Sequence, residues 1–193
     1  MTPTLRTARL TLVPYRPEDE DAFVGLLRDE EVCRWMGQER APEAELRAVF
    51  KVIMDEIYPQ NRFDLWALWL EGAYVGHAEI KKTGNVDGYE IIAAFVRDSW
   101  GKGLGSELVT ELIRYAARTL RVDRVYGMVG AENTASLALC ARLGFTFVRD
   151  VVGDDGSVTK MMVAPTGAAP GTAVAPADET PGREPALPPG PQT

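Results

Sequence analysis

Residues 93–118 read AAFVRDSWGKGLGSELVTELIRYAAR, an apolar run that passes through a glycine-rich loop into an amphipathic segment. This order predicts a strand, a tight loop and then a helix. Gly101, Gly103 and Gly105 allow backbone angles that are closed to bulkier residues, so successive N–H groups can converge on one point. The helix that follows adds the positive end of its dipole. The stretch therefore predicts a loop that binds a phosphate or pyrophosphate.

The spacing of the glycines differs from that of two well-known phosphate loops. A dinucleotide-binding fold has G-x-G-x-x-G directly after its first strand, and a P-loop has G-x-x-x-x-G-K-[ST]. Here the run GKGLGS, residues 101–106, comes late in the chain, and Lys102 lies inside the loop instead of closing it. Taken alone, the loop is equally compatible with an ordinary turn between a strand and a helix.

A second motif begins thirty residues after Gly103. Residues 133–145 read NTASLALCARLGF, in which leucines and alanines predict an apolar helix and Gly144 predicts its end. Residues 122–129, just before it, are typical of a strand.

Together, the two motifs resemble those of the GNAT superfamily of acyl-CoA-dependent N-acetyltransferases, in particular the ribosomal-protein N-terminal acetyltransferases of the RimJ and RimL type. Residues 100–105, WGKGLG, match the W-G-K-G form of that family's pyrophosphate loop. Asn133, Ser136 and residues 142–145 match its second motif, N-x-x-S followed by K/R-L-G-F. The opening, residues 5–36, is similar to the branch's T-x-R-L-x-L-R-P start, although Val13 stands where the branch has arginine. The resemblance covers about residues 5–163.

The resemblance implies an α/β fold with a mixed, largely antiparallel central sheet, whose splayed middle strands admit the cofactor, and with flanking helices. It implies acetyl-CoA as cosubstrate and no metal. Pantetheine would bind the strand edge by strand addition, and N–H groups there would stabilise the oxyanion. The implied cofactor residues are Phe95, Val96, Arg97, Trp100, Gly101, Lys102, Gly103, Leu104, Gly105, Ser106 and Asn133. Asn133 is equally well interpreted as the N-cap of the next helix.

An ammonium acceptor must lose a proton before it can attack, so a carboxylate or an ordered water is needed near the thioester. Glu90 is the first choice as general base, with Glu79 and His77 as rivals; each is otherwise a solvated strand residue. Ser136 is the candidate general acid, with helix packing as the alternative. Cys140 stands where many members of the superfamily carry a tyrosine that reprotonates the departing thiolate. The preferred interpretation of Cys140 is a small buried packing residue.

The predicted activity is direct transfer of an acetyl group to a primary amine, either a protein α-amino group or a small amine, in a ternary complex. The alternative is a non-catalytic domain that senses acyl-CoA or binds a partner. The sequence leaves open whether the protein forms a homodimer. The sequence names neither the acceptor nor the length of the acyl chain.

Composition supports one enzyme domain, residues 1–163, because 46% of the chain is hydrophobic and 25% is charged. Residues 164–193, rich in Pro, Ala and Gly, are expected to form a disordered tail. A net charge of −7 disfavours nucleic acid and favours amines, although it also serves solubility. The absence of a signal peptide and of a long apolar run predicts a cytoplasmic protein without a membrane segment. Two cysteines and one histidine make a disulfide framework or a structural zinc site unlikely by count alone.

The remaining elements follow from periodicity. We expect helices from Pro17 and over residues 42–58, and a helix after the loop that buries Leu108, Leu112 and Ala116. Strands are expected over residues 10–14, 65–70, 74–80, 89–96, 146–151 and 158–163, with a turn at Glu71 and Gly72 between the second and third.

Overall fold

The computed structural model describes residues 1–167 and consists of one mixed sheet with helices on both faces. The eight strands have the spatial order β1-β2-β3-β4-β5-β6-β8-β7. Their bounds are β1 Leu5–Arg6, β2 Leu10–Val13, β3 Asp64–Leu70, β4 Ala73–Lys82, β5 Tyr89–Phe95, β6 Arg124–Gly130, β7 Thr146–Val152 and β8 Val158–Pro165. All neighbours are antiparallel except β5 and β6. The α/β fold with a largely antiparallel sheet is therefore confirmed.

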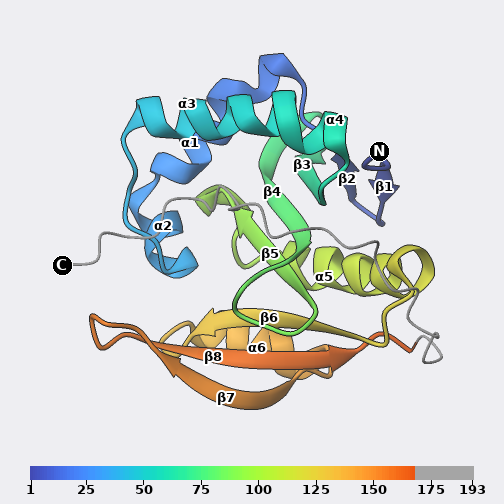
Figure 1. Ribbon diagram of the computed structural model, residues 1–193, viewed down its shortest axis with the longest axis vertical. Helices are drawn as coiled ribbons and strands as arrows, with labels where there is room; N and C mark the ends of the chain where they lie inside the picture. The colour runs from blue at the N-terminus through green and yellow to red at the C-terminus, as the bar shows by residue number, and fades with distance from the viewer. Residues whose placement is uncertain (168–193) are drawn as a thin grey trace.

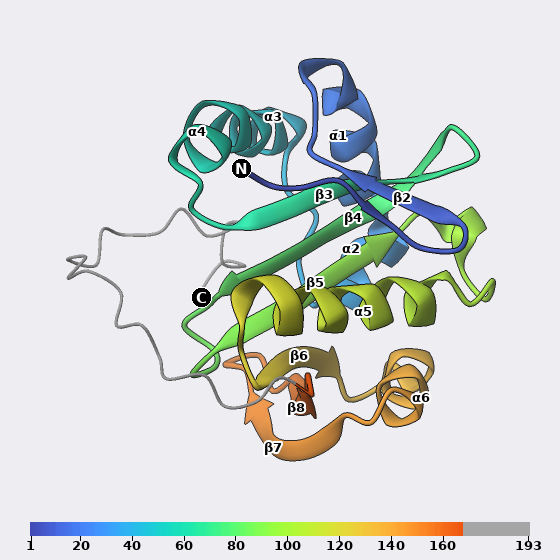
Figure 2. The ribbon, with the colours of Figure 1, turned by 90° about the vertical axis from the view of Figure 1, so that its right-hand side faces the viewer.

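The helices are α1 Glu20–Arg28, α2 Glu30–Met36, α3 Glu43–Val52, α4 Tyr58–Gln60, α5 Leu104–Tyr115 and α6 Thr134–Arg142. In Figures 1 and 2, α1, α3 and α4 lie at the top, and β6, β8 and β7 lie with α6 at the bottom. The central strands β4 and β5, together with α5, lie between these two groups. The chain crosses from β5 to β6 through α5, as a parallel pair of strands requires.

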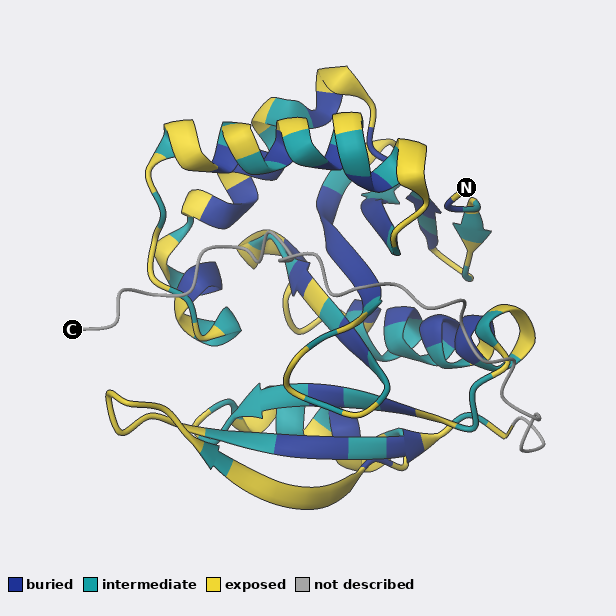
Figure 3. Cartoon of the chain, in the orientation of Figure 1, coloured by how far each residue is buried: buried dark blue, intermediate teal, exposed yellow. Residues whose placement is uncertain are grey.

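Two apolar clusters hold the helices against the sheet. On one face, Leu104, Leu108 and Leu112 of α5 pack with buried residues of β2, β3 and β4, including Trp66 and Ile80. On the other face, residues of α1 and α3 pack over Tyr15, Leu65 and Ala67. Figure 3 shows the buried residues along the inner helix faces and β4. The apolar periods seen in the sequence thus correspond to the faces of the helices that the sheet covers.

Several expected bounds need correction. The helix expected from Pro17 begins as a short 3-10 turn, Pro17–Asp19, and continues as α1. The next helix, α2, was not expected; the side chain of Asp29 starts it by accepting from the N–H groups of Glu31 and Val32. The helix expected over residues 42–58 ends as α3 at Val52 and continues through a π-helical turn, Ile53–Ile57, into α4. Strand β8 runs two residues beyond the expected domain end at 163, and Ala164 is fully buried. The rest of the expected tail, residues 168–193, lies outside the described residues.

Within residues 1–167, no helix has the length and apolar character needed to cross a membrane.

Candidate active site

Strands β5 and β6 separate almost as soon as they meet. Their only paired residues are Glu90 and Tyr126, whereas β4 pairs with β5 from Gly76 to Lys82. Beyond Glu90, Ala93 is exposed although its neighbour Ala94 is buried. The parallel pair therefore opens into a slot along the last residues of β5.

The backbone of β5 offers hydrogen-bonding groups to this slot. The Val96 N–H donates to Val75 O at 3.0 Å, so Val96 faces β4. Because the direction of backbone groups alternates along a strand, the N–H and C=O groups of Ala93 and Phe95 face the slot instead. Within the expected edge, Phe95 to Arg97, the N–H of Val96 is used by β4, and backbone groups that face the slot are also found earlier, at Ala93.

One group of this edge already has a partner inside the protein. The indole Nε1–H of Trp100 donates to the carbonyl of Phe95 at 2.8 Å. Trp100 is 40% exposed, unusually high for a large apolar side chain. Trp100 therefore links the predicted pyrophosphate loop to the strand edge on which pantetheine is expected.

The loop itself has the geometry of an anion site. Gly101 and Gly103 have φ angles of 71° and 76°, in the left-handed region that favours glycine. Gly103 is the N-cap of α5 and provides no side chain to accept from the first N–H groups of the helix. Those donors and the helix dipole fit a pyrophosphate, which supplies the negative charge they lack.

Gly105 serves a different purpose from the other two glycines. It lies inside α5, and a Cβ placed on it would be 2.8 Å from Cδ1 of Leu139 in α6. A Cβ on Gly101 would meet no atom within 4 Å, and one on Gly103 would meet only Arg9 Nη2 at 3.7 Å. The left-handed backbone therefore favours glycine at the first two positions, whereas Gly105 lies where α5 packs closely on the side chain of Leu139.

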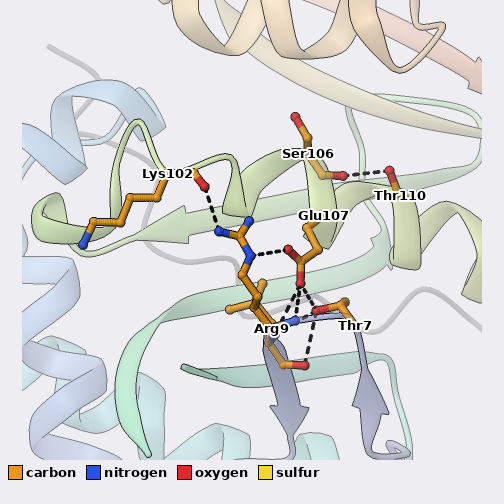
Figure 4. A network of polar contacts seen from close by, with 7 residues as sticks. Thr7, Arg9, Lys102, Ser106, Glu107 and Thr110 are labelled. Atoms are coloured by element: carbon orange, nitrogen blue, oxygen red, sulfur yellow. Dashed lines mark hydrogen bonds and ion pairs between the residues drawn. The ribbon is translucent and has the colours of Figure 1, made fainter. Parts of the chain in front are cut away.

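A polar network holds the loop against the N-terminal hairpin (Figure 4). Arg9 donates from Nη1 to Lys102 O at 3.0 Å and from Nε to Glu107 Oε2 at 2.8 Å. Glu107 also accepts from the Thr7 hydroxyl and from the Arg9 backbone N–H. The side chain of Lys102 extends away from this network. In the first turn of α5, Ser106 contributes its carbonyl to the Thr110 hydroxyl.

Glu90 occupies the closed end of the slot and is 4% exposed. Its Oε2 accepts from the Thr83 hydroxyl at 2.7 Å and from Asn85 Nδ2 at 3.3 Å. Among residues 1–167, no donor reaches its other oxygen, Oε1. Glu90 thus combines a fixed position with one oxygen free to accept a proton.

The rivals His77 and Glu79 are fully engaged. His77 Nε2 lies 2.9 Å from Glu79 Oε1, and His77 Nδ1 lies 3.0 Å from the Tyr15 hydroxyl. Lys81 Nζ lies 2.8 Å from Glu79 Oε2 in an ion pair that lacks the angles of a hydrogen bond. Burial opposes ionisation of Glu79, but His77 and Lys81 outweigh it and lower its pKa to about 2. Glu79 therefore remains ionised, with Oε1 beside His77 and Oε2 paired with Lys81 without a hydrogen bond.

The second motif lies at the start of α6. The Asn133 side chain accepts from the Ser136 N–H at 3.0 Å, which is the N-cap contact expected as one interpretation. No partner for the Ser136 hydroxyl is found within residues 1–167. Cys140 packs in the core beside α5, and burial raises the pKa of its thiol. The packing interpretation of Cys140 agrees with this environment.

An open groove of about 580 Å³ lies where α2 meets the loop after β5. Val96, Arg97 and Trp100 line it together with three carboxylates, those of Asp29, Glu31 and Asp98. Sequence analysis did not predict this acidic rim, nor the roles of Ala93, Thr83 and Arg9. The carboxylates come from segments far apart in the chain, so no local pattern marks them. Thr83 and Asn85, in contrast, are close to Glu90 in the sequence, so a predicted β-hairpin between β4 and β5 would have placed them near its carboxylate.

Comparison with known proteins identifies the family. The model of the acetyltransferase (GNAT) domain matches residues 9–146. The chain belongs to the GNAT acetyltransferase family. It is 28% identical over 152 residues to the uncharacterized N-acetyltransferase YoaA of Bacillus subtilis, covering 75% of this chain and 84% of that protein. It is 32% identical over 155 residues to FsC-acetyl coenzyme A-N(2)-transacetylase of Aspergillus fumigatus, covering 76% and 66%.

Solved structures show the same fold. A GNAT-family acetyltransferase from Bacillus anthracis aligns with a TM-score of 0.71 at 19% identity, covering 85% of this chain and 99% of that chain. Spermidine N-acetyltransferase from Vibrio cholerae, solved with CoA and spermine, aligns with a TM-score of 0.72 at 16% identity, covering 83% and 98%. This GNAT chain is therefore an acetyl-CoA-dependent N-acetyltransferase.

Proposed function

We propose that this acetyltransferase moves the acetyl group of acetyl-CoA directly to a primary amine in a ternary complex. The observation that carries the proposal is the slot between β5 and β6, which leads from Glu90 to a glycine loop at the start of α5. Phe95 and Ala93 would hold pantetheine by their backbone groups, and residues 100–106 would hold the pyrophosphate. The thioester supplies an activated carbonyl carbon, and the N–H groups of the strand edge would stabilise the charge that develops on its oxygen.

The proton balance assigns a role to Glu90. The acceptor ammonium gives one proton to Oε1 of Glu90, directly or through a water. Its nitrogen then forms the new C–N bond while the C–S bond breaks. The nitrogen loses its second proton as the amide forms, and the departing thiolate takes up one proton; the unpartnered hydroxyl of Ser136 is our candidate donor, restored by the proton that the nitrogen releases. Glu79 contributes differently, because it contacts both His77 and Lys81 on β4.

Direct transfer is favoured over an acyl-enzyme because both cysteines of the chain are unsuitable nucleophiles. Cys33 and Cys140 are buried, and burial raises the pKa of each thiol. The Cys33 thiol also donates to Leu27 O at 3.0 Å, which needs the protonated form.

The acceptor is proposed to be a cationic amine. Three carboxylates, Asp29, Glu31 and Asp98, line the groove against one cation, Arg97, and this excess of negative charge would attract an ammonium group. The Vibrio structure is named as a spermidine N-acetyltransferase, and spermidine is a cationic polyamine. The opening motif around Thr7 and Arg9 favours the RimJ and RimL type, and hence a protein α-amino group, as the second candidate. A cytoplasmic location and a homodimer remain part of the proposal.

A turnover assay with an acceptor panel tests the function. Release of CoA thiol is followed with acetyl-CoA and polyamines, small monoamines or peptides with free N-termini. Steady thiol release that depends on the amine is expected. Tight binding of acetyl-CoA without turnover on any acceptor would instead support the sensing domain.

A further inference from the structure

The hairpin formed by β1 and β2 contacts the phosphate loop through one arginine. Arg9 and Glu107 are 98 residues apart in the chain, yet Glu107 binds both the backbone N–H of Arg9 and its guanidinium. The Glu107 side chain is only 16% exposed. Burial opposes its ionisation, but hydrogen bonds from Thr7 and Arg9 outweigh burial and lower its pKa to about 2. Glu107 is therefore a fixed anion that orients the guanidinium of Arg9.

The oriented guanidinium acts on one peptide bond of the loop. Arg9 Nη1 donates to the carbonyl of Lys102, which lies between the left-handed residues Gly101 and Gly103. The carbonyl of Lys102 and the N–H of Gly103 belong to the same planar trans peptide, so they point in opposite directions. Arg9 thus holds the partly negative oxygen toward the hairpin and directs the Gly103 N–H away from it (Figure 4).

The ion pair with Glu107 does not by itself explain the contact of Arg9 with the loop. The guanidinium is half exposed, so its ion pair with Glu107 adds little stability by itself. Its remaining nitrogen, Nη2, lies 3.7 Å from the position that a Cβ on Gly103 would take, which is an ordinary van der Waals distance. A glycine loop without such a contact can rotate its peptides freely, and a rotated carbonyl would repel an anion.

We propose that Arg9 is a positioning residue for the phosphate loop: by holding the Lys102 carbonyl toward the hairpin, it preorganises the loop N–H groups for the pyrophosphate of acetyl-CoA. The inference rests on the proposed role of residues 100–106, and it adds a residue of the N-terminal hairpin to that site. Glu107 and Thr7 act through Arg9. Lysine cannot replace arginine here, because one ammonium does not span both Glu107 and the carbonyl.

The test compares ligands with and without a pyrophosphate. The variants are Arg9→Ala, Arg9→Lys and the control Arg28→Ala, which breaks a similarly exposed ion pair with Glu43 on α3. The ligands are acetyl-CoA, acetyl-dephospho-CoA and acetyl-pantetheine, and CoA affinity is also measured by calorimetry. For Arg9→Ala, KM for acetyl-CoA and Kd for CoA should rise about 10-fold or more, the order expected for losing a charge-assisted hydrogen bond. The kcat should stay near that of the wild type.

The pattern across ligands decides the outcome. We expect the same loss with acetyl-dephospho-CoA and no loss of kcat/KM with acetyl-pantetheine. Arg9→Lys should lose affinity like Arg9→Ala while keeping the wild-type melting temperature, and Arg28→Ala should bind normally. Equal losses with all three ligands would show a purely structural role and overturn the proposal. A loss confined to acetyl-CoA would assign Arg9 to the 3′-phosphate and would also overturn it. A wild type that does not prefer acetyl-CoA to acetyl-pantetheine would refute the proposed loop function itself.

Discussion

At the scale of single residues, the two oxygens of the Glu90 carboxylate have different environments. Thr83 and Asn85 hold Oε2, and Oε1 remains available. Glu90→Gln keeps the size and much of the hydrogen bonding but cannot accept a proton. We expect kcat to fall by about 10²-fold or more while CoA binding is unchanged.

The pH profile tests that assignment. In the wild type, kcat/KM should rise with pH as the free base forms, and in Glu90→Gln the rise should move toward the pKa of the acceptor amine. Asp87→Asn, an exposed charge in the same hairpin, is the control and should behave like the wild type. A Gln variant with the wild-type rate and pH profile would transfer the role to a water or to His77.

The glycines of the loop give a second prediction, since two of them are needed for different reasons. Gly103→Ala places a Cβ on a left-handed residue, which costs roughly 1–2 kcal/mol and should weaken CoA binding. Gly105→Ala improves helix propensity but brings Cβ to 2.8 Å from Leu139, so it should lower the melting temperature.

A double variant separates these effects. Leu139→Ala removes the atom that a Cβ on Gly105 would meet, so adding it to Gly105→Ala should cost less stability than adding it to the wild type. Thermal unfolding and calorimetric titration with CoA measure the two responses. Additive losses would mean that Gly105 is not a packing contact, and normal CoA affinity in Gly103→Ala would contradict the role of the loop.

At the scale of elements, the sequence predicted periodic segments better than their ends. The helix over residues 104–115 and the β3–β4 hairpin carry strong apolar periods, and both were correctly expected. The start of α2 at Asp29 depends on a side-chain cap, and the π-helical turn at residues 53–57 follows α3 directly without a side-chain cap to mark it. The glycines of the loop could be recognised from the local sequence alone. The free edge at Ala93 could not, because it depends on which backbone groups β4 has already used.

The start of α2 yields a third prediction, because Asp29 both caps the helix and lines the acidic groove. Asp29→Asn keeps an effective cap and removes the charge, whereas Asp29→Ala removes both. Asp29→Ala should cost about 1 kcal/mol of stability, and Asp29→Asn should cost little. Both should raise KM for a cationic acceptor by a few fold at low salt, consistent with an exposed charge. If KM for the acceptor were unchanged in both variants, the groove would not be part of the acceptor site.

At the scale of the whole molecule, contacts between distant segments bring the site together. Arg9 of the N-terminal hairpin contacts the loop at Lys102, and the Tyr15 hydroxyl contacts His77 of β4. No sequence motif specifies these pairings, since each joins residues separated by more than fifty positions. The buried charges in these contacts make the stability of the fold depend on pH.

Glu79 provides the last prediction. Its pKa is about 2 in the folded protein and about 4.3 in an unfolded chain, so its carboxylate stabilises the fold fully above that upper value. The contribution falls as the pH drops from about 5 to 2 and is lost below. The groups facing it, His77 and Lys81, favour the anion. Burial raises the pKa values of Tyr15, Tyr58 and Tyr74, so these tyrosines stay neutral in this range.

Glu79→Gln should therefore lose about 3–5 kcal/mol of unfolding free energy at pH 7, because it leaves Lys81 without its buried partner. The difference from the wild type should shrink steadily toward pH 2, where about half of the wild-type carboxyl is protonated in the folded protein. Urea unfolding at several pH values measures it. In Glu79→Gln, the free energy of unfolding should still fall with decreasing pH, because Glu107 also has a pKa of about 2. Glu45→Gln, at an exposed position without an ion pair among residues 1–167, should follow the wild-type curve. A gap that stays constant from pH 7 to pH 3 would show that packing, and not the charge of Glu79, is what the variant removes.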